Sequence, residues 1–165
     1  NDAGVTVRAK GHDHVLDGSL KSSWFKTIGW VPQQPQLAHG TLRHQFQLIV
    51  PTIDDAAITK MLARCGLATT DLPNGLETHL GAAGESSNAA SGGQIRKIAV
   101  ARALISRPQV LIADEPTADL DSESADKVMK TLRGYATSGS VVICITHDVS
   151  IIRTQDSQQS FVATS

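Results

Sequence analysis

Apolar and polar residues alternate near the start of the chain in a way that predicts short strands. Gly4 to Ala9 alternates as a half-buried strand does, and Thr27 to Val31 is a short apolar run closed by Pro32. We therefore expect two strands, in an antiparallel or edge part of a sheet, on either side of a polar stretch from Lys10 to Ser23.

A small helical insert is expected next. Pro51 and Thr52 favour the start of a helix, and the apolar residues that follow recur near helical spacing until Gly66 ends the pattern. These apolar residues are Ile53, Ile58, Met61, Leu62 and Cys65. A turn at Leu72 to Gly75 and a loop of small residues from Ala82 to Ala90 separate the insert from the rest of the chain.

The second half of the chain alternates helical and strand-like segments. Ile95 to Ile105 and Ser122 to Tyr135 have helical spacing, whereas Val110 to Ala113 and Val141 to Ile145 are apolar runs typical of buried strands. The order helix, strand, helix, strand predicts an α/β core with a parallel sheet. In the polar tail, only Phe161 to Ala163 has the character of a strand.

The composition fits one globular domain. Of the 165 residues, 41% are hydrophobic, and the 15 basic and 16 acidic residues leave a net charge of -1, which argues against a nucleic-acid partner. No apolar run approaches the ~20 residues of a membrane span. Cys65 and Cys144 match no metal-ligand spacing, so we expect reduced cytosolic thiols in a core. A start at Asn1 without a signal sequence suits an internal fragment of a cytosolic domain.

Two adjacent carboxylates follow the strand predicted at Val110 to Ala113. In a parallel sheet this places Asp114 and Glu115 at the carboxyl ends of the strands, where α/β proteins bind ligands. One carboxylate there can hold hydrated Mg²⁺, and the next can orient or deprotonate the water that attacks a terminal phosphate. We assign the first role to Asp114 and the second to Glu115; the alternative is a solvated acidic pair at the end of a strand.

The segment from Ser91 to Gln94 stands at the expected start of a helix. Helix N-termini favour anions, and two glycines let the backbone approach a phosphate closely, although an ordinary serine N-cap would look the same. His147 follows the next buried strand and can donate a hydrogen bond to a phosphate oxygen, although a single histidine is more often structural. The order of these features along the chain predicts a phosphate site.

A resemblance to the nucleotide-binding domain of ABC transporters is carried by the run SGGQIRKIAVARALISRPQVLIADEPTADLD, followed by VVICITHD. It covers the signature motif, Walker B strand, D-loop and H-loop of that family. The resemblance implies that Asp114 supports Mg²⁺, that Glu115 acts on the attacking water and that His147 contacts the γ-phosphate of ATP. It also implies that Asp121 lies in the D-loop at a dimer interface. The signature residues, which would contact ATP held mainly by a partner domain, are Ser91, Gly92, Gly93 and Gln94.

Upstream, the chain resembles exporter-type members of this family. Trp30 to Leu37, followed by Gly40 to Arg43, is similar to their Q-loop region, and Leu72 to Thr78 is similar to the segment before their signature. The resemblance makes Gln33 the residue that links Mg²⁺ and water to a membrane domain; the alternative is a surface turn rich in Gln and Pro. The resemblance to the family as a whole covers roughly residues 1 to 150.

Three departures from the family pattern stand out. Ala90 replaces the usual Leu, and Gln94 to Lys97 varies the usual basic continuation, but neither removes a group that faces phosphate. The element that faces the membrane domain could be Gly81 or Gly84-Glu85. The largest departure is that nothing matches G-x-x-x-x-G-K-[ST], since Lys21-Ser22 lacks the glycines of this phosphate loop. We therefore expect an incomplete domain, inactive by itself.

These features predict an α/β fold: a P-loop NTPase-like ABC ATPase core with a mainly parallel sheet, a small helical subdomain and an N-terminal antiparallel β remnant. We expect residues 1–35 to form the β remnant and Q-loop. Residues 36–106 would form the helical subdomain with the signature, and residues 107–165 the core with Walker B, D-loop and H-loop.

The predicted function is ATP binding and hydrolysis, with Mg²⁺, in an ABC exporter. The expected partners are a second ABC ATPase domain, identical or different, and a transmembrane domain at the cytoplasmic face of the cell membrane. The pair Pro116-Thr117 points, among exporters, to the heterodimeric cysteine or glutathione exporter of cytochrome bd assembly. The alternative is a non-transport ABC ATPase, such as a translation factor or a protein of DNA repair or chromosome maintenance.

Overall fold

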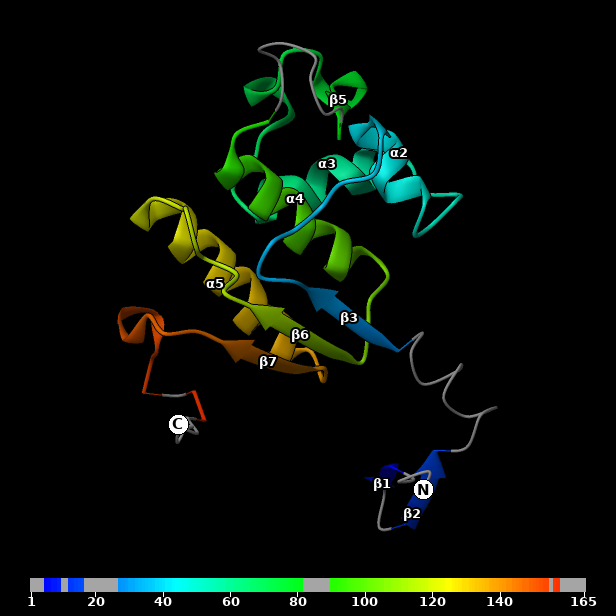
Figure 1. The fold of residues 1–165 in the computed structure, drawn as a ribbon, viewed down its shortest axis with the longest axis vertical. Coiled ribbons are helices and arrows are strands. Elements are labelled where there is room, and N and C mark those ends of the chain that lie inside the picture. The colour runs from blue at the N-terminus through cyan, green and yellow to red at the C-terminus, as the bar shows by residue number, and fades with distance from the viewer. Residues whose placement is uncertain (1–4, 10–11, 17–26, 82–89, 155, 158–165) are drawn as a thin grey trace.

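The computed structural model describes residues 5–9, 12–16, 27–81, 90–154, 156 and 157. Its centre is a parallel sheet in the order β3-β6-β7, formed by β3 (Ile28–Val31), β6 (Val110–Asp114) and β7 (Val141–Ile145) (Figure 1). The predicted parallel core is thus confirmed. The strand expected at Thr27 to Val31 is an edge strand of this sheet rather than part of an antiparallel region.

Two helices cover one face of this sheet. Helix α4 (Gly92–Ile105) packs on β3 and β6, and α5 (Ser122–Thr137) connects β6 to β7 and packs on β7. The strand residues on this side are buried together with apolar residues of both helices. They are Val31, Leu111 and Ala113 from the strands, and Ile98, Leu104, Val128 and Leu132 from the helices.

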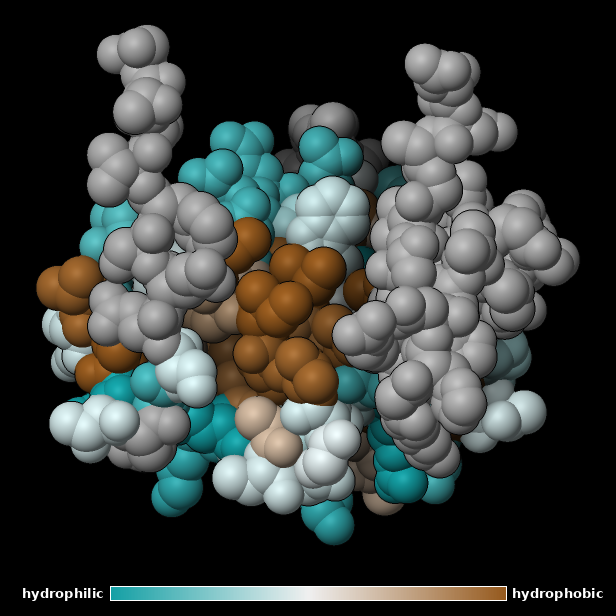
Figure 2. Space-filling view, turned by 90° about the horizontal axis from the view of Figure 1, so that it is seen from below, coloured by the Kyte–Doolittle hydropathy of each residue, from teal (hydrophilic) through white to brown (hydrophobic). Residues whose placement is uncertain are grey.

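The opposite face of the sheet exposes apolar side chains. Trp30 is 66% exposed and pairs in register with Ile112 of β6, which pairs in turn with Ile143 of β7. Val141 and Ile145 are also exposed, on the same side of β7 as Ile143. Figure 2, seen from below, shows a central apolar patch. Parallel sheets of α/β proteins are normally covered on both faces, so a sheet face with this many exposed apolar side chains is unusual.

A helical part lies beyond α4, at the top of Figure 1. Its helix α3 (Asp55–Arg64) begins later than Pro51 and Thr52 suggested, because the Asp54 side chain caps it by accepting a hydrogen bond from the Ala57 N–H at 2.7 Å. Helix α2 (Leu42–Gln47) was not expected from the sequence. The remaining elements are β4 (Gly40–Thr41), η1 (Thr69–Asp71), η2 (Gly75–Glu77) and β5 (His79–Leu80).

An antiparallel hairpin stands at the start of the chain. Strand β1 (Val5–Ala9) pairs with β2 (His12–Leu16), so the expected first strand and the antiparallel region are confirmed. The polar stretch from Lys10 to Ser23, which was expected to lie between two strands, itself contains the strand β2. Polar side chains do not prevent a strand, since the ladder is made by backbone groups.

Several expectations fall outside the described residues. They are the look-alike Lys21-Ser22, the Gly84-Glu85 element, most of the loop from Ala82 to Ala90 and the strand at Phe161 to Ala163. Among the described residues, no helix has the length and apolar character needed to cross a membrane. The short helix η3 (Val149–Ile151) follows β7 and packs near α5.

Candidate nucleotide site

Asp114 and Glu115 leave the sheet at the carboxyl end of β6. Asp114 is the last residue of the strand and pairs in register with Ile145 of β7. Glu115 has a left-handed φ of 47°, while its N–H still donates to the Ile145 carbonyl at 2.8 Å. Left-handed backbone angles are uncommon for residues other than glycine, and they cluster at functional sites. The chain therefore turns sharply at the residue predicted to act on water.

The Glu115 carboxylate is held by the residues that follow β7. Its Oε1 accepts hydrogen bonds from the His147 backbone N–H at 2.9 Å and lies 2.7 Å from His147 Nδ1. Its Oε2 accepts from the Thr146 hydroxyl at 3.2 Å. Burial favours the protonated carboxyl, but the hydrogen bonds from His147 and Thr146 outweigh it, so the pKa of Glu115 lies below its ordinary value. Glu115 is therefore ionised at neutral pH.

The direct contact between Glu115 and His147 joins two residues that lie 32 positions apart. A carboxylate can only accept, so Nδ1 of His147 carries the proton of this hydrogen bond and Nε2 is left facing away from it. The His147 side chain is 87% exposed, so its ring is accessible to a ligand. Sequence reasoning missed Thr146, although its position directly before His147 was a signal that could have found it.

The signature segment forms the N-terminus of α4. Ser91 caps the helix, with its side chain accepting from the Gln94 N–H at 3.2 Å and the Gln94 Oε1 accepting from the Ser91 N–H at 2.8 Å. This confirms that the segment starts a helix. Gly93 packs closely on the turn after β6: a Cβ at this position would lie 3.2 Å from the Asp119 carbonyl oxygen and from the Leu120 side chain.

Asp121 has a structural contact in this chain. Its carboxylate caps α5 by accepting hydrogen bonds from the Ser124 N–H at 2.9 Å and the Ser124 hydroxyl at 2.7 Å. These bonds lower the pKa of Asp121. A role of Asp121 at ATP stays a prediction, since the structure accounts for this carboxylate as a helix cap.

Gln33 lies in the segment that follows β3, with its side chain exposed. Its backbone carbonyl accepts a hydrogen bond from Arg96 Nη1 at 2.6 Å. No hydrogen bond of the Gln33 side chain occurs within the described part of the chain, so its amide is available to a ligand.

The structure brings together only some of the predicted residues. Glu115 and His147 touch, and Gly93 lies against the turn that contains Asp119. Across the described ranges, no hydrogen bond or ion pair joins Ser91 to Gln94 with Asp114, Glu115 or His147.

The donor set fits Mg²⁺ held mainly by phosphate and water. Asp114 and Gln33 offer oxygen atoms, which Mg²⁺ prefers, and the Asp114 carboxylate has no hydrogen bond or ion pair within the described ranges. The described part of the chain contains no group of three or more His, Cys, Asp or Glu side chains that could hold a metal ion. Mg²⁺ commonly takes one or two protein ligands beside substrate phosphates, so Asp114 and Gln33 are sufficient candidates.

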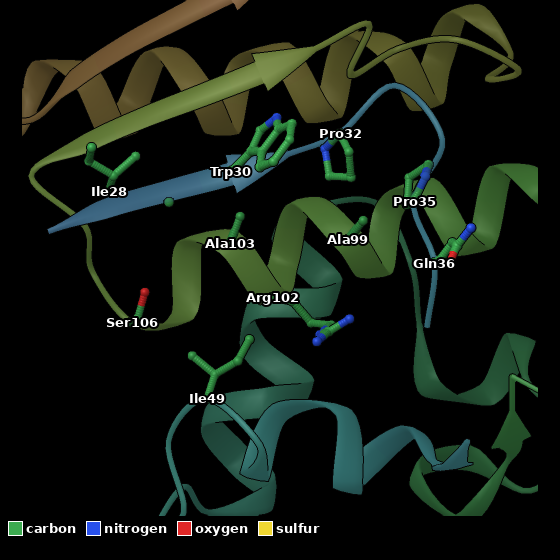
Figure 3. A pocket seen from close by; sticks show the side chains of 11 residues that line it. Ile28, Trp30, Pro32, Pro35, Gln36, Ile49, Ala99, Arg102, Ala103 and Ser106 are labelled. Atoms are coloured by element: carbon green, nitrogen blue, oxygen red, sulfur yellow. The ribbon is translucent and has the colours of Figure 1, made fainter. Parts of the chain in front are cut away.

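A shallow pocket of about 240 Å³ lies along the edge of β3 (Figure 3). Its walls come from β3, the segment after it and α4, with Trp30, Pro35, Arg102 and Ala103 among the lining residues. None of Asp114, Glu115 and His147 lines it, so it is distinct from the carboxylate site.

Comparisons with known proteins identify relatives of this chain. The family model described as ABC transporter matches residues 3–118. The glutathione/L-cysteine transport system ATP-binding/permease protein CydC of Bacillus subtilis is 34% identical over 130 residues, which are 78% of this chain and 22% of that protein. The mitochondrial ATP-dependent permease MDL1 of Saccharomyces cerevisiae is 37% identical over 148 residues, 87% of this chain and 21% of that protein.

A solved structure of a bacterial Atm1-family ABC exporter with ATP bound has a similar fold, with a TM-score of 0.69 and 26% identity. The match covers 86% of this chain and 24% of that one. The chain thus spans between a fifth and a quarter of the length of these relatives. By its match to the family model and its parallel core, the chain belongs to the ABC transporter family and has the fold of that family's ATPase domain.

Proposed function

We propose that this chain contributes the Walker B carboxylates, the signature and the Q-loop to an ATPase domain of an ABC exporter, which hydrolyses ATP to drive transport. The observation that carries the proposal is the ionised Glu115 at the end of β6, held by His147 from the end of β7. The names of the relatives, which describe two permeases and an exporter, support the exporter class.

In this proposal Glu115 orients and deprotonates the water that attacks the γ-phosphate. A carboxylate with a lowered pKa is ionised at neutral pH and can accept that proton. Asp114 and the Gln33 side chain would hold Mg²⁺, which neutralises charge on the phosphates when bound.

His147 would fix the position of Glu115 and contact the γ-phosphate. Because Nδ1 already donates to Glu115, Nε2 can donate to a phosphate oxygen only if the ring carries a second proton. Alternatively, the ring would move away from Glu115 when ATP binds.

The segment Ser91 to Gln94 would serve ATP held by a second ATPase domain. Its glycines present the backbone N–H groups of a helix N-terminus, which bind anions. Closure of two domains around ATP, followed by reopening after hydrolysis, would drive the transmembrane domain at the cytoplasmic face of the membrane. The β3 pocket, beside the Q-loop and lined by Trp30 and Pro35, is a suitable place for that transmembrane domain to dock.

The test is ATP turnover by the intact protein. We expect Glu115→Gln to lower the rate constant of hydrolysis by about 10² to 10⁴, the range for loss of a general base, with little change in ATP binding. Glu123→Gln is the matched control, because Glu123 is an exposed acid on the first turn of α5 and, among the described residues, forms an ion pair only with Lys127. Equal turnover in wild type and Glu115→Gln would reject the proposed role.

A further expectation concerns residues 1–165 purified alone. They contain no G-x-x-x-x-G-K-[ST] loop, so we propose that they show no significant ATP turnover. Mg²⁺-dependent phosphate release that is abolished by Glu115→Gln would overturn this.

The substrate class is a finer proposal. The chain is 34% identical to CydC, whose name describes a glutathione and L-cysteine transport system. This similarity supports the proposal, suggested by Pro116-Thr117, that the protein exports thiols. Stimulation of ATP turnover by glutathione or cysteine in the reconstituted protein would support it. A non-transport ATPase is not favoured, because the relatives named above are permeases or exporters.

A further inference from the structure

Arg96 connects three segments of the candidate site. It lies on the second turn of α4 and is only 5% exposed. Its Nη1 donates to the Gln33 carbonyl at 2.6 Å and to the Pro32 carbonyl at 3.4 Å. Its Nη2 lies 3.6 Å from Asp119 Oδ2, in the turn between β6 and α5. The guanidinium of Arg96 on α4 thus contacts both the segment after β3, at Pro32 and Gln33, and the turn after β6, at Asp119.

The contacts of Arg96 are specific to an arginine. A buried charge is costly unless it is paired and hydrogen-bonded, and a planar guanidinium can address two carbonyls and a carboxylate at once. The Arg96 Nε is buried without a partner within the described ranges, so this side chain is held in place despite an unsatisfied donor. Burying this charge costs far more free energy than forming an exposed ion pair, so we infer that Arg96 has a specific role.

The contact with Gln33 restrains the backbone and leaves the side chain free. Arg96 bonds the Gln33 carbonyl, whereas the Gln33 amide, the proposed ligand of Mg²⁺ and water, is exposed. On the other side, Asp119 has a left-handed φ of 62°, and its carbonyl oxygen lies against Gly93 of the signature. The same short region therefore joins the Q-loop, the signature and the turn after β6.

We propose that Arg96 is a positioning residue, which fixes the backbone of Gln33 relative to the signature helix and the Asp119 turn. Through Gln33 it sets where the amide reaches the nucleotide, and through Asp119 it couples that position to the surface that faces a second domain. The proposal rests on the proposed function for its effect on catalysis, but the restraint on the backbone is a property of this chain alone.

The restraint is tested by NMR relaxation of the backbone amides in the intact protein, because the exposed N–H groups of residues 33, 34 and 36 report the motion of this segment through their order parameters. We expect Arg96→Gln to lower the order parameters of these residues and of residues 118–120 from about 0.85 to below about 0.6, with helix α5 unchanged. Arg96→Lys, which keeps the charge but loses the planar pair of donor nitrogens, should recover part of the order. Asp119→Asn should loosen only residues 118–120; since Asp119 is exposed and asparagine tolerates its backbone angle, this variant will fold.

Arg133→Gln is the control for loss of stability. Arg133 is a half-buried arginine that binds Asp156 with both Nε and Nη2, outside the candidate site. This variant should lower stability without lowering the order parameters of residues 33, 34 and 36. Unchanged order parameters of these residues in Arg96→Gln, or a decrease of equal size throughout the sheet and helices, would overturn the proposal.

A kinetic cycle tests whether Arg96 acts through Gln33. We expect Arg96→Gln to lower kcat for ATP about tenfold to a hundredfold, as a small misplacement of a positioned group does, with KM for ATP nearly unchanged. Gln33→Ala removes the amide but keeps the carbonyl, so in that background Arg96→Gln should have little further effect. Fully additive losses would overturn action through Gln33. Failure of the proposed function is recognised separately, because Glu115→Gln would then leave turnover intact while the result for the order parameters stands.

Discussion

Glu115 and Asp119 both adopt left-handed backbone angles, with φ of 47° and 62°. Such angles cost an L residue of the order of 1 kcal/mol or more, so surrounding contacts must hold them. At Glu115 these contacts are its N–H bond to Ile145 and the hydrogen bonds from His147 and Thr146. The strain lies where the sequence predicted chemistry, and it could not be read from the sequence because glutamate is not a residue that favours this conformation.

The two cysteines give a prediction at the same scale. Burial raises the pKa of Cys65 to about 12 and that of Cys144 to about 11, so both are thiols at neutral pH. In the native protein near pH ~8 we expect slow alkylation of partly exposed Cys144 and essentially none of buried Cys65, with Cys144 labelling rising first as pH increases. Peptide mass spectrometry after timed alkylation measures this. Equal labelling of both cysteines before denaturation would contradict it.

Among the elements, the helix starts depend on single capping side chains. Asp54 caps α3, so we expect Asp54→Ala to lower the free energy of unfolding by about 1 kcal/mol. Asp54→Ser, which keeps an oxygen acceptor, should lose much less. Chemical denaturation of both variants at neutral pH measures the difference. If alanine and serine destabilised equally, the cap would not be the source of the effect.

The sequence predicted the elements that have strong local signals. Strand β7 was expected with the same bounds, and α4 was expected from its apolar spacing after a serine cap. Helix α2 was missed because six residues with three of them buried carry too little periodicity, and β2 because a polar strand depends on its pairing partner. The Arg96 contact with Gln33 joins positions 63 apart, and no local pattern reports such a contact.

At the candidate site, the sequence indicated that Glu115 and His147 follow adjacent strands, but it did not indicate how their side chains meet. Carboxyl ends of adjacent parallel strands meet at one edge of the sheet, which is why Glu115 and His147 touch. The pairing of the His147 ring with Glu115 depends on the turn after each strand. Those turns, with the left-handed angle at Glu115, are set by packing rather than by residue type.

At the scale of the whole molecule, one sheet face carries exposed apolar residues on β3 and β7. Such a face favours association when nothing covers it, so we expect residues 1–165 purified alone to self-associate. Ile143→Thr combined with Val141→Thr should shift the molecules toward monomer in sedimentation experiments. Leu48→Thr is the control, since Leu48 is exposed in the helical part instead. A wild-type chain that stays monomeric at high concentration would contradict this expectation.

In the proposed function, ATP is enclosed between two ATPase domains, with Glu115 activating the attacking water and the signature of the partner domain closing over the nucleotide. The most direct measurement is the unhydrolysed ATP that the intact protein retains through rapid gel filtration with Mg²⁺. We predict that Glu115→Gln retains ATP whereas wild type does not, and that adding Ser91→Arg, which places a large side chain at the signature, abolishes retention. Retention that is absent in Glu115→Gln, or that is unaffected by Ser91→Arg, would contradict the account.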